Sequence, residues 1–237
     1  MQKSNQLMAL FSQADAALLQ PHLRPVFLEQ QQVLVEAGHP IQSIYFPLDA
    51  IVSLVVGLST GEIIEVAMVG RDGAACIGAA LDGRIALSRA IVQLEGDALV
   101  CDVGALKNIV AQSPGMVSIL MRHEQLVYSQ AQQSAACMAA HDLEARLCRW
   151  LLRARDLVET DTLHFTQEFL AEMLGVRRSS VSVVAHTLQQ AGMIKYSRGR
   201  IQIVDIGALR ETVCECYGTV RSHHEMLLGE ASQAGHA

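Results

Sequence analysis

The stretch from residue 166 to 201 reads TQEFLAEMLGVRRSSVSVVAHTLQQAGMIKYSRGRI, and it decides the fold of the C-terminal part of the chain. Thr166 is placed to cap a helix. The apolar residues of that helix face inward: Phe169, Leu170, Met173 and Leu174. Gly175 stands where a sharp turn requires a residue that tolerates positive φ. A second helix starts in RRSS and turns Val181, Val184 and Leu188 inward, so the sequence predicts a helix-turn-helix.

Two short strands, MIKYS and RIQIVD, follow around Arg198 and Gly199 and predict a β-hairpin wing. Residues 175–201 hold five cations and no carboxylate, whereas the whole chain has 24 Asp+Glu against 18 Lys+Arg and a net charge of -6. A carboxylate facing phosphate would repel it, so an acid-free basic segment suits a nucleic-acid surface. Two adjacent arginines alone would equally fit a solvated helical hairpin. Cap, turn, apolar spacing and wing together favour DNA binding.

The geometry of a recognition helix predicts the DNA contacts. Its first turns lie nearest the base edges, where Arg can donate two hydrogen bonds to guanine and Ser is an adaptable partner. The N-terminus of the preceding helix can meet a phosphate, and the wing arginines suit a neighbouring phosphate or the minor groove. The predicted DNA-binding residues are Thr166, Gln167, Arg177, Arg178, Ser179, Ser180, Ser182, Arg198 and Arg200.

From about residue 26 to 102 the sequence consists of short apolar or alternating runs separated by turns rich in Gly, Pro and Asp. The runs are SIYF, AIVSLVV, EIIEVAMV, RAIVQL and ALVCDV. Strands at regular spacing with Gly-bearing turns predict an antiparallel β barrel or roll. The small residues GAACIGAAL, at 73–81, interrupt the pattern and predict a short helix. About the first 21 residues predict one or two short amphipathic helices.

A long helix is predicted from residue 113 to 140, with Pro114 in its first turn. Its apolar stripe recurs at spacings of three and four: Met116, Ile119, Leu120, His123, Leu126 and Val127. Such a stripe either lies on its own domain or pairs with a copy of itself. The length of the helix and its position between two domains favour a dimer. Residues 141–158 predict a further helix, which Asp142 can cap.

Six cysteines are present without any Cys-x-x-Cys pair, and only Cys214 and Cys216 are close in sequence. Without a secretion signal we expect reduced thiols. In a helix the two sulfurs of C-x-C would point about 200° apart, which is poor for chelation. We therefore predict no metal site, and a redox role for this pair stays open. No catalytic order of Ser, His and Asp and no phosphate loop occurs, so no enzyme is expected. The charge-free apolar run at 50–61 is too short to span a bilayer, and we expect a cytoplasmic protein without a membrane partner.

Over almost its whole length the chain resembles the Crp/Fnr superfamily of bacterial transcription regulators. Residues 166–203 are similar to its winged helix-turn-helix; Arg178 matches the family's first recognition-helix Arg, and Ser179 stands where Glu is usual. SIYFPLDAIVSL resembles the YF-x-x-x-G-x-V strand pair of the family's cyclic-nucleotide-binding-type roll, with Ala50 in place of Gly. The resemblance implies an α+β fold: a β-roll over 1–112, a dimerisation helix over 113–140 and a winged helix-turn-helix domain over 141–237. It also implies a homodimer on an inverted repeat of double-stranded DNA, with RNA polymerase as a candidate partner.

The roll departs from the phosphate cassette of the members that bind cyclic AMP, which pairs Gly with Glu and places an Arg before Ser or Thr. No Glu falls between Arg71 and Asp82, and Ser88 occupies the usual Arg position. Arg89 is one residue off, and a one-residue slip turns a strand side chain to the other face. Cyclic AMP is therefore not expected. The predicted effector pocket is Gly70, Arg71, Asp72, Gly73, Ser88 and Arg89, with the ligand unknown.

Two alternatives remain for the effector: a small-molecule or cyclic-dinucleotide sensor, and a regulator that needs no ligand. No cofactor is predicted. The oxygen-sensing branch of the family uses an N-terminal cysteine cluster, and no cysteine precedes Cys76, so an iron–sulfur cluster of that type is not expected. His22, His39 and His123 are interpreted as surface or structural residues rather than haem ligands.

Overall fold

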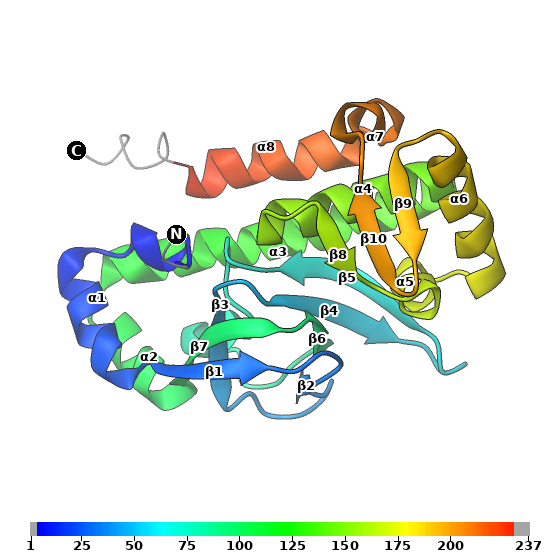
Figure 1. Ribbon diagram of the computed structural model, residues 1–237. Coiled ribbons are helices and arrows are strands. Elements are labelled where there is room, and N and C mark those ends of the chain that lie inside the picture. The colour runs from blue at the N-terminus through cyan, green and yellow to red at the C-terminus, as the bar shows by residue number, and fades with distance from the viewer. Residues whose placement is uncertain (1–3, 230–237) are drawn as a thin grey trace.

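The N-terminal part of the chain is an antiparallel roll of two sheets in the computed structural model, which describes residues 4–229 (Figure 1). One sheet has the order β1-β7-β3 and the other β2-β6-β4-β5. The strands are β1 Arg24–Leu28, β2 Val33–Val35, β3 Ser43–Pro47, β4 Ile51–Gly57, β5 Ile63–Val69, β6 Arg89–Leu94 and β7 Gly96–Asp102. The alternating runs of the sequence predict β3 to β7, and the structure confirms them. It adds β1 and β2, most of whose side chains are exposed or half-buried.

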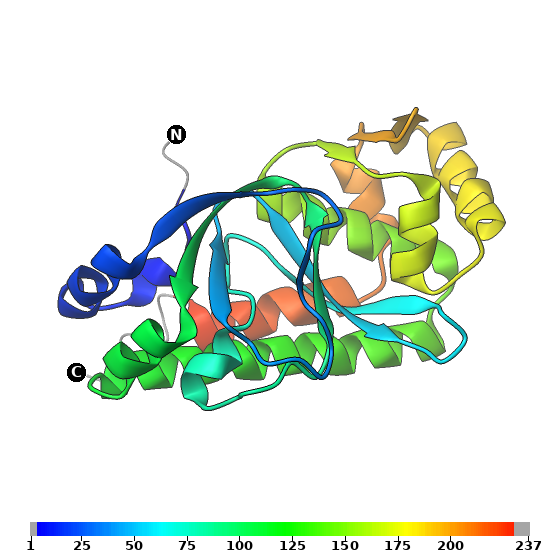
Figure 2. The ribbon, with the colours of Figure 1, turned by 90° about the horizontal axis from the view of Figure 1, so that it is seen from below.

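Short helices close the end of the roll that lies away from the winged domain (Figure 2). They are η1 Met8–Leu10, α1 Gln13–Leu19, η2 Gln20–His22 and α2 Val103–Val110. Ser12 and Asp102 cap the two α-helices by accepting hydrogen bonds from backbone N–H groups. The small-residue run forms a 3-10 helix, η3 Ile77–Leu81. The amphipathic N-terminal helices and the short helix within the roll are thus confirmed.

The predicted long helix is α3 Pro114–Ala140, and it runs along the whole molecule (Figures 1 and 2). Ser113 caps it, its Oγ accepting from the Met116 N–H at 3.1 Å. The apolar stripe, however, faces the chain's own core. Met116, Ile119, Leu120 and Leu126 pack in one cluster with Leu7, Ile44 and Leu106 of the N-terminal part, and His123 is only 2% exposed. The predicted stripe therefore packs on the N-terminal part of the chain and is not a free dimer surface.

The C-terminal part contains the predicted winged helix-turn-helix. Its elements are α4 Leu143–Val158, β8 Thr162–His164, α5 Gln167–Leu174, α6 Arg178–Gln190, β9 Ile194–Ser197, β10 Arg200–Ile203 and α7 Ile206–Thr212. Asp142 caps α4, as predicted, by accepting from the Ala145 N–H at 2.9 Å. The strand β8 was not foreseen; it pairs with β10 and makes the wing a three-stranded sheet. The core of this part contains three aromatic rings: Phe165 stacks on Phe169, and Trp150 meets Phe165 edge to face.

The roll and the winged domain share a hydrophobic core. Ile51, Val55 and Met68 of the roll belong to the same buried cluster as Leu147 and Trp150 of α4. At the turn between α5 and α6, a Cβ added to Gly175 would lie 3.1 Å from the Ile64 side chain of β5. The winged domain is therefore packed on the roll as well as joined to it through α3 and α4.

The last helix of the described chain, α8 Cys216–Leu228, leaves the winged domain and lies along α3 (Figures 1 and 2). Leu228, near its end, joins the N-terminal core beside Leu7 and Leu120. The sequence-based limits place residues 216–228 with the DNA-binding domain, but their packing is against the long helix. Within residues 4–229, no helix has both the length and the apolar character needed to cross a membrane.

Candidate nucleic-acid interface and ligand cavity

The helix-turn-helix is fixed by local capping and by one glycine. The Thr166 Oγ1 accepts a hydrogen bond from the Phe169 N–H at 3.1 Å, which closes the first turn of α5. Gly175 follows α5 in the left-handed region, with φ at +63°. Its neighbour Val176 donates its N–H back to the Ala171 carbonyl at 2.9 Å. This is the geometry that ends one helix and starts the next within a few residues, as the sequence predicts.

The first turn of α6 presents polar side chains to solvent. Arg177, Arg178 and Ser179 are exposed, and Ser180 is half-buried. The Ser182 hydroxyl is already engaged, since it lies 2.6 Å from the Gln167 Oε1 and 3.1 Å from the Arg178 carbonyl. In this structure Ser182 and Gln167 hold α5 and α6 together, while the arginines and Ser179 are free to meet a partner.

The wing carries the remaining predicted cations. Arg198 and Gly199 join β9 to β10 with φ values of +50° and +75°, a two-residue turn whose positive φ angles match the twist of a hairpin. Arg198 and Arg200 are exposed, and so is Lys195. Together with His164 they border an open hollow of about 1000 Å³ that no carboxylate lines. The wing therefore adds exposed cations to those at the start of α6.

One residue of the recognition helix escaped the sequence analysis. The Val183 side chain is 67% exposed, although it is apolar. It follows Ser179 by four residues, so the two lie on the same face of α6. An exposed aliphatic group there can contact a thymine methyl in the major groove. The four-residue spacing from Ser179 could have placed Val183 on the exposed face of the helix, but a valine is by residue type assigned to the core.

A cavity of about 420 Å³ lies between the roll and α3. Aliphatic and small side chains from β2, β4, β5 and the segment 74–90 form most of its wall. Glu124 is its only charged residue, and Cys76, Ser88 and Tyr128 supply the other polar groups. Burial raises the pKa of the Cys76 thiol to about 12, and the charge of Glu124 acts in the same direction. Cys76 is therefore a neutral thiol near neutral pH, and the cavity has no cation to offer.

Only Ser88 of the six predicted pocket residues lines this cavity. The segment 70–73 leaves the end of β5 on the opposite side and turns toward α4. There Arg71 pairs with Glu159, and Asp72 accepts from Arg153 at 2.7 Å. Gly73 packs on α3, where an added Cβ would lie 2.4 Å from the His123 Nε2. The six residues therefore do not line one common cavity, and their part in effector binding stays a prediction.

Arg89 and His123 also take structural positions. Arg89 points away from the cavity, as the register argument predicts, and its Nε lies 2.7 Å from the Glu36 carboxylate. The buried His123 accepts a hydrogen bond from the Ala74 N–H through Nε2 at 3.1 Å. This hydrogen bond holds the loop around Ala74 against α3.

Asp72 and Arg153 form an ion pair between the roll and α4. Burial by itself would raise the pKa of Asp72, but the charges of Arg153 and His224 hold it below its ordinary value. The carboxylate therefore stays ionised at neutral pH and joins the two parts. A hollow of about 530 Å³ beside this pair is bordered by Arg155, Arg221 and other residues of mixed charge.

Metal-ligand side chains also gather within the described residues. Cys137, His141, Cys214 and Cys216 place their donor atoms within 4.8 Å of one another. The sequence analysis considered only the last two of these residues. The cluster lies at the junction of α3 and α4, apart from both the recognition helix and the roll cavity.

A roll, a long helix and a winged helix-turn-helix define a two-domain architecture. Residues 145–212 match the Crp-like helix-turn-helix domain. FixK2 from Bradyrhizobium japonicum superposes with a TM-score of 0.70 at 13% identity, over 81% of this chain and 98% of that one. A regulator of the Crp/Fnr family from Eubacterium rectale gives 0.65 at 17% identity, over 87% and 96%. CLP from Xanthomonas campestris, described as a c-di-GMP responsive global regulator, gives 0.66 at 13% identity, over 82% and 100%.

The search of curated proteins finds no match to the sequence. The domain match and the shared fold nevertheless agree with one another. Residues 145–212 are a Crp-like helix-turn-helix domain, and the chain has the fold of solved Crp/Fnr regulators. The resemblance noted in the sequence and the α+β fold class are thereby confirmed.

Proposed function

We propose that the protein binds DNA as a homodimer on an inverted repeat, with one α6 in each of two successive major grooves. The observation that carries this proposal is the set of exposed cations on and beside α6 and on the wing: Arg177, Arg178, Lys195, Arg198 and Arg200. Two-fold related recognition helices read half-sites about 34 Å apart, one turn of the duplex. An interaction with RNA polymerase is expected only from the family resemblance.

An uncharged exposed face of α3 supports the dimer. Exposed residues recur along it at alternating spacings of three and four: Ser118, Met121, Gln125, Tyr128, Gln132, Ala135 and Ala139. The Met121 and Tyr128 side chains are 60% and 64% exposed. This is the a/d spacing of a coiled-coil seam, and it lies opposite the stripe that packs on the roll. A long exposed helix face without charge is better suited to a second copy of itself than to water.

The contacts with DNA divide into two kinds. Arg178, Ser179 and Val183, which are exposed on α6, are proposed to contact the base edges through hydrogen bonds to guanine and an apolar contact to thymine. The wing cations and the N-terminus of α5 are placed for phosphates, which set position rather than sequence. The operator is thus expected to differ from the family's usual half-site, because Ser179 replaces the usual Glu.

The roll cavity is proposed as the effector site, and its chemistry limits the ligand. A cyclic nucleotide phosphate would need a cation, but the only charge bordering the cavity is that of Glu124. We infer that the effector is a small, mostly apolar molecule without negative charge, rather than cyclic AMP or a cyclic dinucleotide. Tyr128 borders the cavity and also belongs to the exposed face of α3. Occupancy of the cavity would therefore act on the dimer seam.

The test is the selection of bound DNA from a random pool, with and without a metabolite extract. We expect an inverted repeat whose half-sites are one helical turn apart. A selected pool without sequence preference, or with single half-sites only, would contradict the proposal. Enrichment that is unchanged by the extract would favour the alternative of a regulator that needs no ligand.

The dimer seam has its own test. Met121→Glu places a charge in the middle of the exposed face of α3 and should shift the protein from dimer to monomer in sedimentation. Leu18→Glu, at an apolar position of α1 that is 53% exposed, is the matched control and should leave the dimer intact. A dimer that survives Met121→Glu would exclude this seam.

A further inference from the structure

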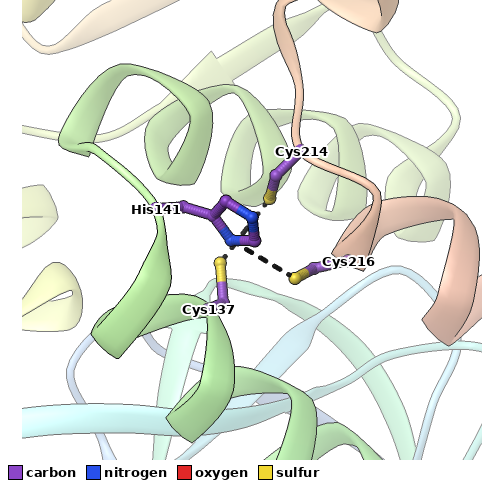
Figure 3. A group of neighbouring side chains, drawn as sticks. All are labelled: Cys137, His141, Cys214 and Cys216. Carbon is purple, nitrogen blue, oxygen red and sulfur yellow. Dashed lines mark hydrogen bonds between the residues drawn. The ribbon is translucent and has the colours of Figure 1, made fainter.

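We propose that Cys137, His141, Cys214 and Cys216 bind one zinc ion, which ties the junction of α3 and α4 to the loop between α7 and α8 (Figure 3). Cys137 lies in the last turn of α3, and His141 is the residue that follows this helix. Cys214 lies in the loop after α7, and Cys216 begins α8. All four side chains point toward one another in Figure 3.

The distances fit a single tetrahedral ion. The Cys137 and Cys214 sulfurs are 3.6 Å apart, and the Cys216 sulfur is 3.6 Å from the His141 Nδ1. A tetrahedral site with Zn–S bonds of about 2.3 Å has sulfurs separated by about 3.8 Å. The sulfur–sulfur distance is also too long for a disulfide bond, and all the cysteines are free. The side chains are therefore arranged around one point rather than joined in pairs.

The surroundings of the four residues are those of a metal site. The His141 Nε2 lies 3.2 Å from the Glu215 carboxylate, which directs the other ring nitrogen toward the sulfurs. Carboxylate–histidine–metal triads orient their ligand in the same way. The Gln133 amide donates to the Cys216 sulfur at 3.0 Å, a contact that suits a thiolate. Three thiolates and a neutral imidazole around Zn²⁺ leave one negative charge once three thiol protons have departed.

The environment of the cluster can balance that charge. Arg149 of α4 acts electrostatically on Cys137, and its buried Nε has no hydrogen-bond partner among the described residues. The cysteines themselves are almost fully buried: Cys137 is 0%, Cys214 8% and Cys216 1% exposed. A dry set of thiolates next to a guanidinium favours a firmly held ion over an exchangeable one.

The donor set and its size select the metal. Three thiolates and one imidazole suit zinc, and four protein ligands leave no open position, which marks a structural rather than a catalytic site. In a [4Fe–4S] cluster each thiolate binds a different iron. Its ligand atoms therefore surround a cube of iron and sulfide and lie farther apart than the edges of one ion's tetrahedron. The compact arrangement thus points to a single ion.

The position of the site gives it a mechanical role, and this part of the inference rests on the proposed function. The His141 N–H bonds the Cys137 carbonyl at 3.0 Å and ends α3, and the next residue, Asp142, caps α4. The chain changes direction here between the long helix and the DNA-binding domain. An ion that joins this junction to the loop between α7 and α8 fixes the angle at which the recognition helix is presented. Loss of the ion should weaken operator binding without touching any DNA contact.

The experiment starts from full-length protein purified anaerobically with a thiol reductant. Metal analysis should give about one zinc per chain. After zinc removal, Co²⁺ should produce the visible absorption of a tetrahedral ion and a thiolate-to-cobalt charge-transfer band. Cys214→Ser should lose the stoichiometric zinc and weaken that band. Cys76→Ser, which changes a partly buried thiol in the roll cavity, is the matched control and should keep both.

A second variant keeps the test valid if Cys214→Ser does not fold. Glu215 is a surface residue whose side chain is 75% exposed, so Glu215→Ala should leave the fold intact. Because it removes only the partner of His141, it should lower cobalt affinity about 10–100-fold. Circular dichroism of each variant separates loss of metal from loss of structure.

Several results would overturn the site. They are a reduced protein without zinc and without a tetrahedral cobalt spectrum, equal cobalt binding in Cys214→Ser, iron together with acid-labile sulfide, or a Cys137–Cys214 disulfide in place of metal. The two proposals fail separately. If the cobalt spectrum stands but no operator is selected, the proposed function is wrong; if an operator is selected but no metal binds, the zinc site is wrong.

Discussion

The recognition surface and the cysteine–histidine cluster are built in opposite ways. All the recognition residues lie between Thr166 and Arg200, and local rules of capping, turn and helix period place them. The cluster joins Cys137 to Cys214, which are 77 residues apart. The first surface is cationic and exposed, whereas the second is buried. Local sequence rules can therefore locate a binding surface, but a site made of distant segments exists only once the chain path is known.

Metal removal should give the largest effect and the sharpest contrast. Chelation of the zinc should lower the free energy of unfolding by about 4 kcal/mol if zinc is present at 1,000 times its dissociation constant. Thermal unfolding with and without a chelator measures this. Arg178→Ala is the control for the other region, and its unfolding should match that of the unchanged protein. If Arg178→Ala destabilised the protein as much as zinc removal does, the two regions would not differ in their contribution to stability.

Glu65 is buried in β5 and belongs to neither region. It tests how strongly burial changes the pKa of a carboxyl group. Desolvation raises its pKa to about 7, against the opposing effects of the Ser53 hydroxyl and of Arg149 and Arg153. The Ser53 Oγ lies 2.5 Å from the Glu65 carboxyl and 2.9 Å from the Gln93 Oε1. Because the folded state binds this proton more tightly than the unfolded state, Glu65 lowers stability as the pH rises from about 4.5 to about 7.

Glu65→Gln should therefore stabilise the protein by about 3 kcal/mol at pH 8 and leave it unchanged at pH 4. Denaturant unfolding of both proteins across this pH range checks the sign. Glu62→Gln, at an exposed residue of the same hairpin, is the matched control. A stabilisation that does not depend on pH would show that ionisation of Glu65 is not the cause.

Arg178→Ala should affect DNA recognition alone. Loss of a bidentate contact to guanine costs about 1–3 kcal/mol and relaxes the preference at one base pair of each half-site. Binding to the selected operator and to its single-base variants measures both effects. Arg84→Ala, at an exposed arginine of the roll, is the control and should bind as before. Unchanged specificity in Arg178→Ala would remove this residue from the base edges.

The smallest effect is expected at the residue that the sequence analysis missed. Val183→Ala should weaken operator binding by less than about 1 kcal/mol, because it removes only a small apolar contact. The loss should be largest at a base pair that contains thymine. Competition between operators that carry thymine or uracil at each position would locate the methyl contact. No difference between the two bases at any position would place Val183 outside the groove.

The sequence-based predictions agree best with the structure where an element depends on neighbouring residues. The Thr166 cap, the Gly175 turn, the hairpin at Arg198 and Gly199, and strands β3 to β7 follow from propensity and period, and the structure confirms them. The long helix was also predicted, with its start at Pro114. The apolar stripe that was predicted for the dimer packs instead on the chain's own core, because an apolar stripe does not reveal whether its partner is the same chain or another.

The sequence by itself determined the winged helix-turn-helix and its acid-free segment 175–201, because backbone geometry and charge there depend on neighbouring residues. Tertiary structure alone decided the wall of the roll cavity and the gathering of Cys137 and His141 with Cys214 and Cys216. The C-x-C pair is poorly placed for chelation only if both residues are helical. Cys214 lies before α8, where the chain turns to pack along α3, and that turn brings both sulfurs to one point. Long-range packing, which no local pattern encodes, is the reason.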